Sequence, residues 1–246
     1  MNIYIIGSGS NGNATLITNK DNKLLIDCGV GIKLMKSRLQ EINYSFDDIK
    51  DVLITHEHED HVKSLKYFKN TNFYGECNIE GLIPLHDLET TIINNFKVTP
   101  IPLSHDASYT VGYVIEDEEE KLVYITDTGY IKNKYYQYIK NATHYIIESN
   151  YDVEMLINSS RPKFLINRIM SNKGHLGNID SASIMKDLIG NHTKTITLAH
   201  LSGDCNSEEK ALNTYLNVMK DNYVDLSDIQ LKCASRSKLI IVKGCE

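Results

Sequence analysis

Short apolar runs, separated by polar and glycine-containing segments, dominate the pattern of the chain. Runs of this length that are bounded by turn residues predict strands. We expect strands at residues 2–6, 14–18, 23–27, 52–54, 73–74, 96–101, 110–115, 122–126, 145–147, 195–199, 230–234 and 239–242. Apolar positions at helical spacing predict helices at residues 32–40, 62–68, 132–140, 180–189 and 207–215. Strands that come first and then alternate with helices indicate an α/β (α+β) fold with two packed sheets and helices outside.

A glycine-rich segment follows the first expected strand. Residues 7–12 read GSGSNG, which fits G-x-G-x-x-G, and Asp27 lies twenty residues beyond Gly7. A dinucleotide site of this kind needs a helix that opens at the third glycine, because the helix N-terminus holds the pyrophosphate. Two short strands and a turn follow instead, so a dinucleotide cradle is disfavoured. We expect a tight turn, and a nest of backbone amides that binds an anion is an equally good interpretation.

Composition favours one domain, residues 1–246, because 41% of the residues are apolar and no linker or low-complexity stretch divides the chain. Neither a signal peptide nor a membrane-length apolar run is visible, which predicts a cytoplasmic protein without a membrane partner. The cysteines are odd in number and form no C-x-x-C pair, which predicts reduced, buried thiols. They are Cys28, Cys77, Cys205, Cys233 and Cys245. The acidic run 116–120 joins two expected strands and predicts a solvated hairpin turn.

The most concentrated chemistry lies in residues 56–61, which read HEHEDH directly after an apolar run. Histidines and carboxylates that are gathered near a core cost free energy unless they are paired or bound to metal. Imidazole together with carboxylate suits zinc, manganese or iron. The segment is not the H-E-x-x-H helix of metalloproteases, because His58 and His61 are three residues apart and are expected in a loop. A metal site explains this density better than a solvated charged loop does.

H-x-H-x-D-H after a strand resembles the signature of the metallo-β-lactamase fold superfamily. The remaining elements of that pattern follow in order along the chain: Asp27 in LLIDCG, His105 in PLSHDA, Asp127 in VYITDTG and His200 in ITLAHLS. The resemblance covers essentially the full length. It implies a four-layer αββα sandwich, with two mixed sheets and helices outside, and a metal-dependent hydrolase.

The same resemblance implies two divalent metal ions, Zn or Mn, with Fe also compatible. It places His56, His58 and His105 on one ion and Asp60, His61 and His200 on the other, with Asp127 and a hydroxide between them. Two such ions generate hydroxide at neutral pH and stabilise an in-line displacement. Asp60 would also act in catalysis, and Asp27 would lie behind the ligands and orient their loop.

Six segments narrow the resemblance to the small bacterial YycJ/WalJ group, whose members are regarded as DNA exonucleases: GSGSNGNAT, ITHEHEDHVKSL, LSHDASYTVGY, ITDTGYI, ESNYD and KGHLGN. His175, in the last of them, resembles the histidine loop of the tRNA 3′-processing nucleases. A cation or proton donor there would stabilise a departing oxyanion, so we expect His175 to be catalytic; a solvent-exposed loop histidine is the alternative. Where the group's pattern reads GHLSN, this chain has Gly177, which puts a hydroxyl contact there in doubt.

Two stretches could bind a phosphate backbone although the formal net charge is −6. Residues 161–179 contain four lysines and arginines besides His175, and residues 130–145 contain three lysines and five tyrosines; neither stretch has an acid. Basic and aromatic residues together suit a strand held by its phosphates and stacked by its bases. Tyrosines that pack a helix explain the second stretch at least as well. As substrate contacts we expect Ser8, Asn13, Arg168, Lys173 and Asn178.

We therefore expect a metal-dependent phosphodiesterase that hydrolyses nucleic acid, with a 5′ to 3′ DNA exonuclease as the leading hypothesis and DNA favoured over RNA. A hydrolase of a cyclic phosphodiester, thioester or lactam, or a small RNase, remains an alternative, because the fold does not fix the substrate. A redox di-iron protein is disfavoured, because His58 stands where those proteins carry a carboxylate. A non-catalytic binding protein would not need a complete ligand set.

Overall fold

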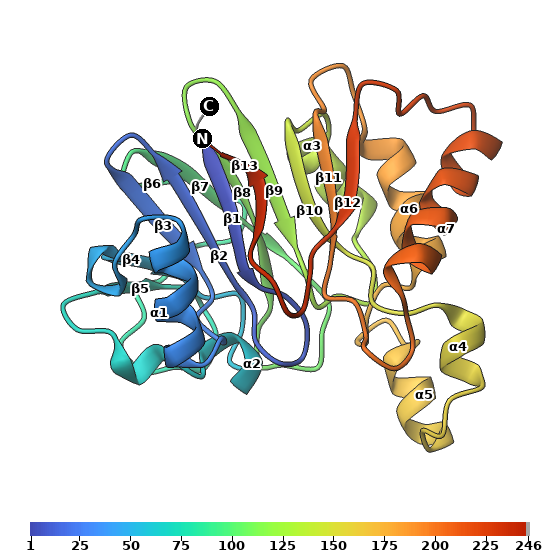
Figure 1. Cartoon of the computed structure of the whole chain (residues 1–246), viewed down its shortest axis with the longest axis horizontal. Coiled ribbons are helices and arrows are strands. Elements are labelled where there is room, and N and C mark those ends of the chain that lie inside the picture. Colours follow the sequence, from blue (N-terminus) through green and yellow to red (C-terminus); the bar gives the residue numbers. More distant parts are fainter. Residues whose placement is uncertain (245–246) are drawn as a thin grey trace.

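Strands from both halves of the chain form the first of two sheets in the computed structural model, which describes residues 1–244 (Figure 1). Its strand order is β13-β1-β2-β3-β4-β5. These strands are β1 (Asn2–Gly7), β2 (Ala14–Asn19), β3 (Asn22–Ile26), β4 (Asp51–Leu53), β5 (Asn72–Tyr74) and β13 (Ile240–Lys243). Strands β1 to β3 are antiparallel, whereas β3, β4 and β5 run parallel to one another.

The second sheet has the order β12-β11-β10-β9-β8-β7-β6. Its strands are β6 (Thr91–Ile93), β7 (Phe96–Pro102), β8 (Val111–Glu116), β9 (Lys121–Ile125), β10 (His144–Glu148), β11 (Thr195–Ala199) and β12 (Gln230–Cys233). It is antiparallel from β6 to β9 and parallel from β9 to β12. Only β6 is absent from the sequence-based expectation, and its Ile92 is exposed, so the short edge strand shows no apolar run of strand length.

Both faces of each sheet are buried, which explains why the strands read as continuous apolar runs. Tyr113 and Ile115 belong to the cluster between the sheets, whereas Val114 belongs to the cluster beneath the helices. Helix α1 supplies Met35 to the core on the outer face of the first sheet, and α7 supplies Tyr215 to the core of the second. The expected four-layer αββα sandwich is confirmed.

The helices are α1 (Ile32–Glu41), α2 (Glu59–Val62), α3 (Tyr136–Ile139), α4 (Val153–Ile157), α5 (Lys163–Ile169), α6 (Asn178–Leu188) and α7 (Glu208–Asp221). The expected helix at 62–68 is replaced by the end of α2 and a 3₁₀ turn at residues 65–67. The expected helix at 132–140 is a 3₁₀ turn at residues 133–135 followed by the short α3. Helices α4 and α5 were not expected, and Figure 1 shows them projecting beyond the sheets at the lower end of the molecule.

Two expectations about polar segments have different outcomes. Cys28, Cys77, Cys205 and Cys233 are free and buried, as predicted, and Cys245 lies outside the described residues. The acidic run does join β8 to β9, but the prediction that it is solvated is wrong for Glu120, which is only 6% exposed. Cations explain this burial, because Lys243 Nζ lies 2.7 Å from Glu120 Oε2. Within residues 1–244, no helix has the length and apolar character needed to cross a membrane.

Candidate metal centre

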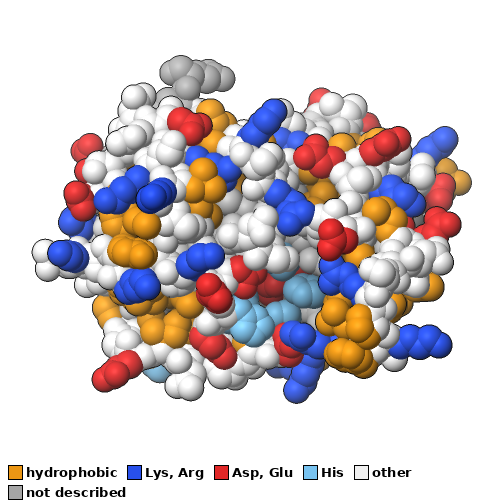
Figure 2. Space-filling model, turned by 60° about the horizontal axis from the view of Figure 1, so that its bottom comes forward, with side chains coloured by type: hydrophobic (Ala, Val, Ile, Leu, Met, Phe, Trp, Pro, Cys, Tyr) orange, Lys and Arg blue, Asp and Glu red, His pale blue; other side chains and the backbone are white. Residues whose placement is uncertain are grey.

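The residues of the expected site follow the ends of different strands, and these ends meet at one edge of the sandwich. Asp27 follows β3, His105 follows β7, Asp127 follows β9 and His200 follows β11. Figure 2 shows histidine and acidic side chains gathered in a hollow on this face. Three of these residues adopt left-handed backbone conformations, with φ of 58° at Asp27, 56° at Asp127 and 57° at His200. Such conformations are uncommon for residues other than glycine and tend to occur at functional sites.

The expected ligands form compact groups. In each group the potential ligand atoms lie within 4.8 Å of one another. One group holds His56, His58 and His105, another holds Asp60, His61 and His200, and a third joins Asp127 to His56 and His61. The geometry therefore brings together all seven residues that the sequence suggested as ligands.

Hydrogen bonds to one nitrogen of His61, His105 and His200 fix the direction of these three rings. His61 Nδ1 lies 2.7 Å from Asp27 Oδ2, and His105 Nδ1 lies 3.0 Å from the carbonyl oxygen of Gly174. His200 Nδ1 lies 2.9 Å from Glu148 Oε1. Histidines that bind metal characteristically use their second nitrogen in this way, because the outer partner sets the tautomer and the ring orientation. Asp27 thus contacts the candidate ligand His61 through the nitrogen Nδ1, and its role in orienting the loop stays a prediction.

Several inner atoms of the cluster have no partner of their own. Among the described residues, His56 Nε2 and His200 Nε2 are buried and make no hydrogen bond, and Asp127 Oδ2 has only the charged contact with His61 Nε2 at 3.1 Å. A buried polar atom without a partner costs free energy, so native structures rarely contain such atoms without a water or an ion. Imidazole nitrogen and carboxylate oxygen are donors that suit zinc and manganese. The cluster therefore fits divalent metal.

Burial and neighbouring charges shift the pKa values of side chains in this cluster. Burial raises the pKa of the Asp127 carboxyl, but the charges of His200 and His61 outweigh burial and hold that pKa well below its usual range. Burial lowers the pKa of His61, yet Asp27 and Asp127 outweigh it and raise the pKa to about 10. His61 therefore attracts a positive charge strongly, whereas burial lowers the pKa of His56 and of His105, which favours their neutral, metal-binding form.

Glu148 is a functional candidate that the sequence analysis missed. It ends β10, is fully buried, and its Oε1 lies 2.8 Å from His175 Nδ1 as well as 2.9 Å from His200 Nδ1. Its Oε2 accepts hydrogen bonds from the backbone N–H groups of Thr128 and Leu176. Burial raises the pKa of Glu148, but the two histidines outweigh it and lower the pKa to about 2. The available signal was a lone acid at the end of an apolar strand, the same signal that identified Asp27 and Asp127.

His175 belongs to a fourth group of potential ligand atoms, with Asp127, Glu148 and His200. Its Nδ1 is 3.5 Å from Asp127 Oδ1 and contacts Glu148, and its side chain is 19% exposed. Burial lowers the pKa of His175, but the neighbouring Glu148 outweighs burial and raises it. The alternative of a free, solvent-exposed loop histidine does not agree with this geometry.

Gly177, which replaces the serine of the group's pattern, has a packing reason in this chain. A Cβ atom at residue 177 would lie 2.9 Å from Cε2 of Tyr151, whose ring is buried. Tyr151 therefore occupies the space that a serine side chain would need.

The expected substrate contacts fall into two classes. Ser8, Asn13 and Asn178 are buried and bonded within the protein, which speaks against direct contact with a substrate. Ser8 Oγ accepts a hydrogen bond from His200 N, Asn13 Nδ2 lies 3.0 Å from His61 Nε2, and Asn178 bonds to Asn206. Ser8 and Asn13 thus hold the ligand loops, and Gly9 N donates to Asn13 Oδ1 inside the expected tight turn.

Arg168 and Lys173 are exposed near His175, so the first basic stretch does border the cluster. Arg168 forms an ion pair with Asp106, the residue after His105. The second stretch follows the packing alternative. Tyr135 and Tyr145 are core residues, and Tyr136 and Tyr138 pack against the same core cluster.

Comparisons with known proteins agree with this geometry. The family described as "Beta-lactamase superfamily domain" matches residues 72–200, and the family described as "Anti-Pycsar protein Apyc1" matches residues 1–83. Exodeoxyribonuclease YycJ of Bacillus anthracis is 33% identical over 239 residues, with 90% of each chain covered. Exodeoxyribonuclease WalJ of Streptococcus pneumoniae serotype 2 strain D39 is 33% identical over 231 residues, which cover 87% of this chain and 86% of WalJ.

A solved structure supports the fold. The metallo-β-lactamase fold protein YhfI from Bacillus subtilis has a TM-score of 0.71 at 15% identity, over 98% of this chain and all of YhfI. The fold implies divalent metal ions, and the histidine and aspartate groups described above are the candidate site for them. The chain belongs to the YycJ/WalJ family of metallo-β-lactamase-fold hydrolases.

Proposed function

We propose that this chain is a DNA exonuclease that hydrolyses phosphodiesters from the 5′ end with two divalent metal ions, zinc or manganese. The observation that carries the proposal is the position of His175, which is held by Glu148 at 2.8 Å on the rim of the metal-binding groups. The names of the YycJ and WalJ relatives support DNA as the substrate.

Two ions are supported by the division of the donors. His56, His58 and His105 form one group, Asp60, His61 and His200 form another, and the Asp127 carboxylate lies against both. When bound, the ions would activate water at neutral pH and neutralise charge on the attacked phosphate.

His175 is placed to act as the proton donor. Because Glu148 engages Nδ1 and raises the pKa of the imidazole, the protonated form of the ring is favoured, and Nε2 would serve as the donor to a substrate. In the proposed reaction His175 protonates the oxygen that leaves phosphorus, which removes the cost of expelling an alkoxide. Asp60 Oδ2 lies 3.8 Å from His200 Nε2 and can accept a proton from the attacking water.

The test is incubation of metal-reconstituted protein with duplex DNA, single-stranded DNA and RNA, each labelled at one chosen end, and with bis-p-nitrophenyl phosphate. We expect DNA to shorten progressively from the 5′ end, and we expect His58→Ala and His175→Ala each to lower the rate by about 100-fold or more. His192→Ala serves as the matched control, because His192 is exposed and belongs to none of the metal-binding groups of the described residues.

Each outcome has a distinct meaning. Hydrolysis of the small diester alone, with no loss in His175→Ala, would overturn the nuclease proposal in favour of a small-molecule hydrolase. Faster shortening of RNA than of DNA would show that the protein is an RNase and would overturn the DNA exonuclease proposal. Shortening of DNA from the 3′ end would refute the polarity but leave the nuclease in place.

A further inference from the structure

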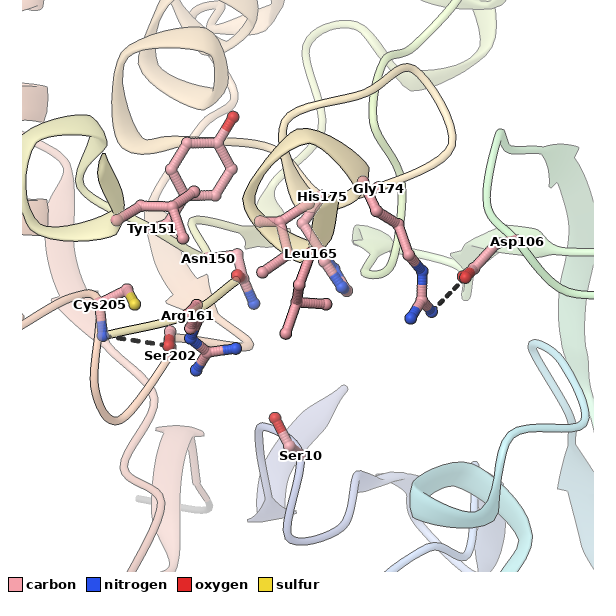
Figure 3. Close-up of a pocket in the computed structure, with 13 residues that line it drawn as sticks. Ser10, Asp106, Asn150, Tyr151, Arg161, Leu165, Gly174, His175, Ser202 and Cys205 are labelled. Carbon is pink, nitrogen blue, oxygen red and sulfur yellow. Dashed lines mark hydrogen bonds and ion pairs between the residues drawn. The ribbon is translucent and has the colours of Figure 1, made fainter. Parts of the chain in front are cut away.

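A cavity of about 150 Å³ opens beside the metal-binding groups, on the side of His175 (Figure 3). By the space that one buried water needs, it has room for about ten water molecules. Its lining comes from four separate parts of the chain: Ser10 of the glycine loop, Asp106 of the loop after β7, Ser202 of the loop after β11, and the segment that contains α4 and α5. None of the expected metal ligands lines it, whereas His175 does.

The cavity has an apolar inner wall. Tyr151, Leu156 and Cys205 form a small hydrophobic cluster, and Ile169 packs against it. All four residues line the cavity. The other lining residues are mostly polar or charged, so the cavity offers one apolar face and several hydrogen-bonding groups, which suits a polar organic group.

Two arginines line the cavity, and each is paired with an aspartate. Arg161 Nη2 lies 3.2 Å from Asp204 Oδ2, and Arg168 pairs with Asp106. The Asp204 side chain is 83% exposed, so the pair that orients Arg161 is weak enough for an anion to displace it. A third arginine lies close by, because a Cβ atom at Gly203, between Ser202 and Asp204, would meet the guanidinium of Arg236. Arg236 does not line the cavity, but among residues 1–244 it has no ion pair with a carboxylate, so it adds positive charge that the two paired arginines do not supply.

In the proposed reaction, the cavity lies on the side of the phosphorus atom from which the leaving group departs. The water oxygen forms the new bond to phosphorus, the bond from phosphorus to the 3′ oxygen breaks, and His175 supplies the proton that the 3′ oxygen takes up. The fragment with the new 3′ hydroxyl is the one toward the 5′ end, and it lies on the side of His175. A cavity on that side, which His175 lines, therefore meets the nucleotide that departs.

We propose that this cavity binds the 5′-terminal nucleotide of the DNA strand, with Arg161 and Arg168 at its 5′-phosphate. The inference rests on the proposed exonuclease function and adds the group that the enzyme recognises at the end of the strand. The apolar wall receives the sugar and base, and the small size of the cavity limits each cut to a short fragment.

The test compares two duplexes that carry the same 3′ label and differ only in a 5′-phosphate or a 5′-hydroxyl. We expect the 5′-phosphorylated duplex to be degraded about tenfold faster, and we expect Arg161→Gln and Arg168→Gln each to reduce that ratio by about threefold or more. Lys186→Gln removes one positive charge from α6, away from the cavity, and should keep the wild-type ratio. Thermal unfolding of each variant shows whether it is folded.

A binding measurement keeps the pocket testable without catalysis. Calorimetry should show that 5′-dAMP binds about tenfold more tightly than deoxyadenosine to the wild-type protein, and that Arg161→Gln loses most of this difference. Equal rates on the two duplexes, or a preference that survives both arginine substitutions, would overturn the pocket while leaving the nuclease intact. If no nucleic acid is degraded, the proposed function fails, and the binding of 5′-dAMP alone decides whether the pocket exists.

Discussion

Single side chains at strand ends set the chemistry of this site, and Glu148 connects two of its functions. One carboxylate oxygen contacts both His175, the proposed proton donor, and His200, a candidate metal ligand. The other oxygen is held by two backbone N–H groups, so the carboxylate is fixed. A fixed buried anion orients both rings and favours the protonated form of His175.

Glu148→Gln tests this role while it preserves the shape of the side chain. We expect kcat on bis-p-nitrophenyl phosphate to fall by about 100-fold, because an uncharged amide does not raise the pKa of His175 and its NH2 group would face either the two backbone N–H donors or the two rings. The limb at high pH in the pH profile of kcat, measured next to metal content, should move to lower pH. The exposed Glu118, on the β8–β9 hairpin, gives the control Glu118→Gln, which should retain activity. Unchanged kcat in Glu148→Gln would refute the role.

At the scale of residues, the sequence predicted the site where reactive side chains are concentrated, but it did not predict features that depend on the three-dimensional arrangement. The HEHEDH segment and the acids after apolar strands could be predicted as site residues, because buried charged groups need a function or a partner. The left-handed backbone conformation of Asp27, Asp127 and His200 could not be predicted from the sequence, since it depends on how each strand joins the loop that follows it. For the same reason the burial of Ser8 and Asn13 could not be distinguished from a position on the substrate surface.

At the scale of elements, three loops lock together to hold the HEHEDH segment. Cys28 N donates to His61 O at 2.7 Å, and Asn13 N donates to Asp60 O at 2.7 Å. Gly29 makes this approach possible, because a Cβ atom there would lie 1.7 Å from Asp60 O. Backbone on both sides leaves no flexible group that could move away.

Gly29→Ala is therefore expected to displace the loop that carries Asp60 and His61. We expect a destabilisation of about 2 kcal/mol or more, which lowers Tm by roughly 4 to 8 °C, with a loss of metal affinity. Calorimetric unfolding and metal titration measure the two effects. Gly31→Ala is the matched control, because nothing lies within 4 Å of a Cβ atom at that position. Similar behaviour of the two variants would show that the loops tolerate separation.

Most strands were predictable because they are buried on both faces, and most of the long helices because they cover a sheet. Helices α4 and α5 were missed for a physical reason: they pack on a small separate cluster around Leu156, so their apolar residues show no long amphipathic pattern. Phe164 of α5 is even 75% exposed. The basic residues of this segment, rather than a periodic pattern, indicated that it has a function. The cavity at Arg161 could not be predicted from the sequence, because its lining residues come together only in the folded structure.

At the scale of the whole molecule, a second charged cluster ties the two sheets together at the ends of the strands away from the metal-binding groups. Glu120 Oε2 contacts Lys243 Nζ of β13 at 2.7 Å, and Glu120 Oε1 lies 3.5 Å from Nε2 of the buried His144 in β10. Burial raises the pKa of Glu120, but hydrogen bonds from Lys243 and the N-terminal ammonium outweigh burial and lower the pKa to about 2. Burial lowers the pKa of His144 to about 4, although Glu120 opposes it.

Both shifts predict that stability falls in acid, over two different ranges. Between pH 6.5 and about 4, the unfolded chain binds a proton at His144 that the folded protein does not, so stability decreases as the pH falls. Glu120 contributes stability that is present above pH 4.5 and is lost as the pH falls toward about 2.

Urea unfolding at pH 7 and pH 5 isolates the range in which His144 titrates. We expect His144→Gln to reduce the difference in unfolding free energy between these pH values by roughly 2 kcal/mol relative to wild type, and this comparison cancels the protons of the metal-binding groups. His192→Gln changes an exposed histidine and should leave the difference unchanged; equal differences in wild type and His144→Gln would assign the acid sensitivity to another group.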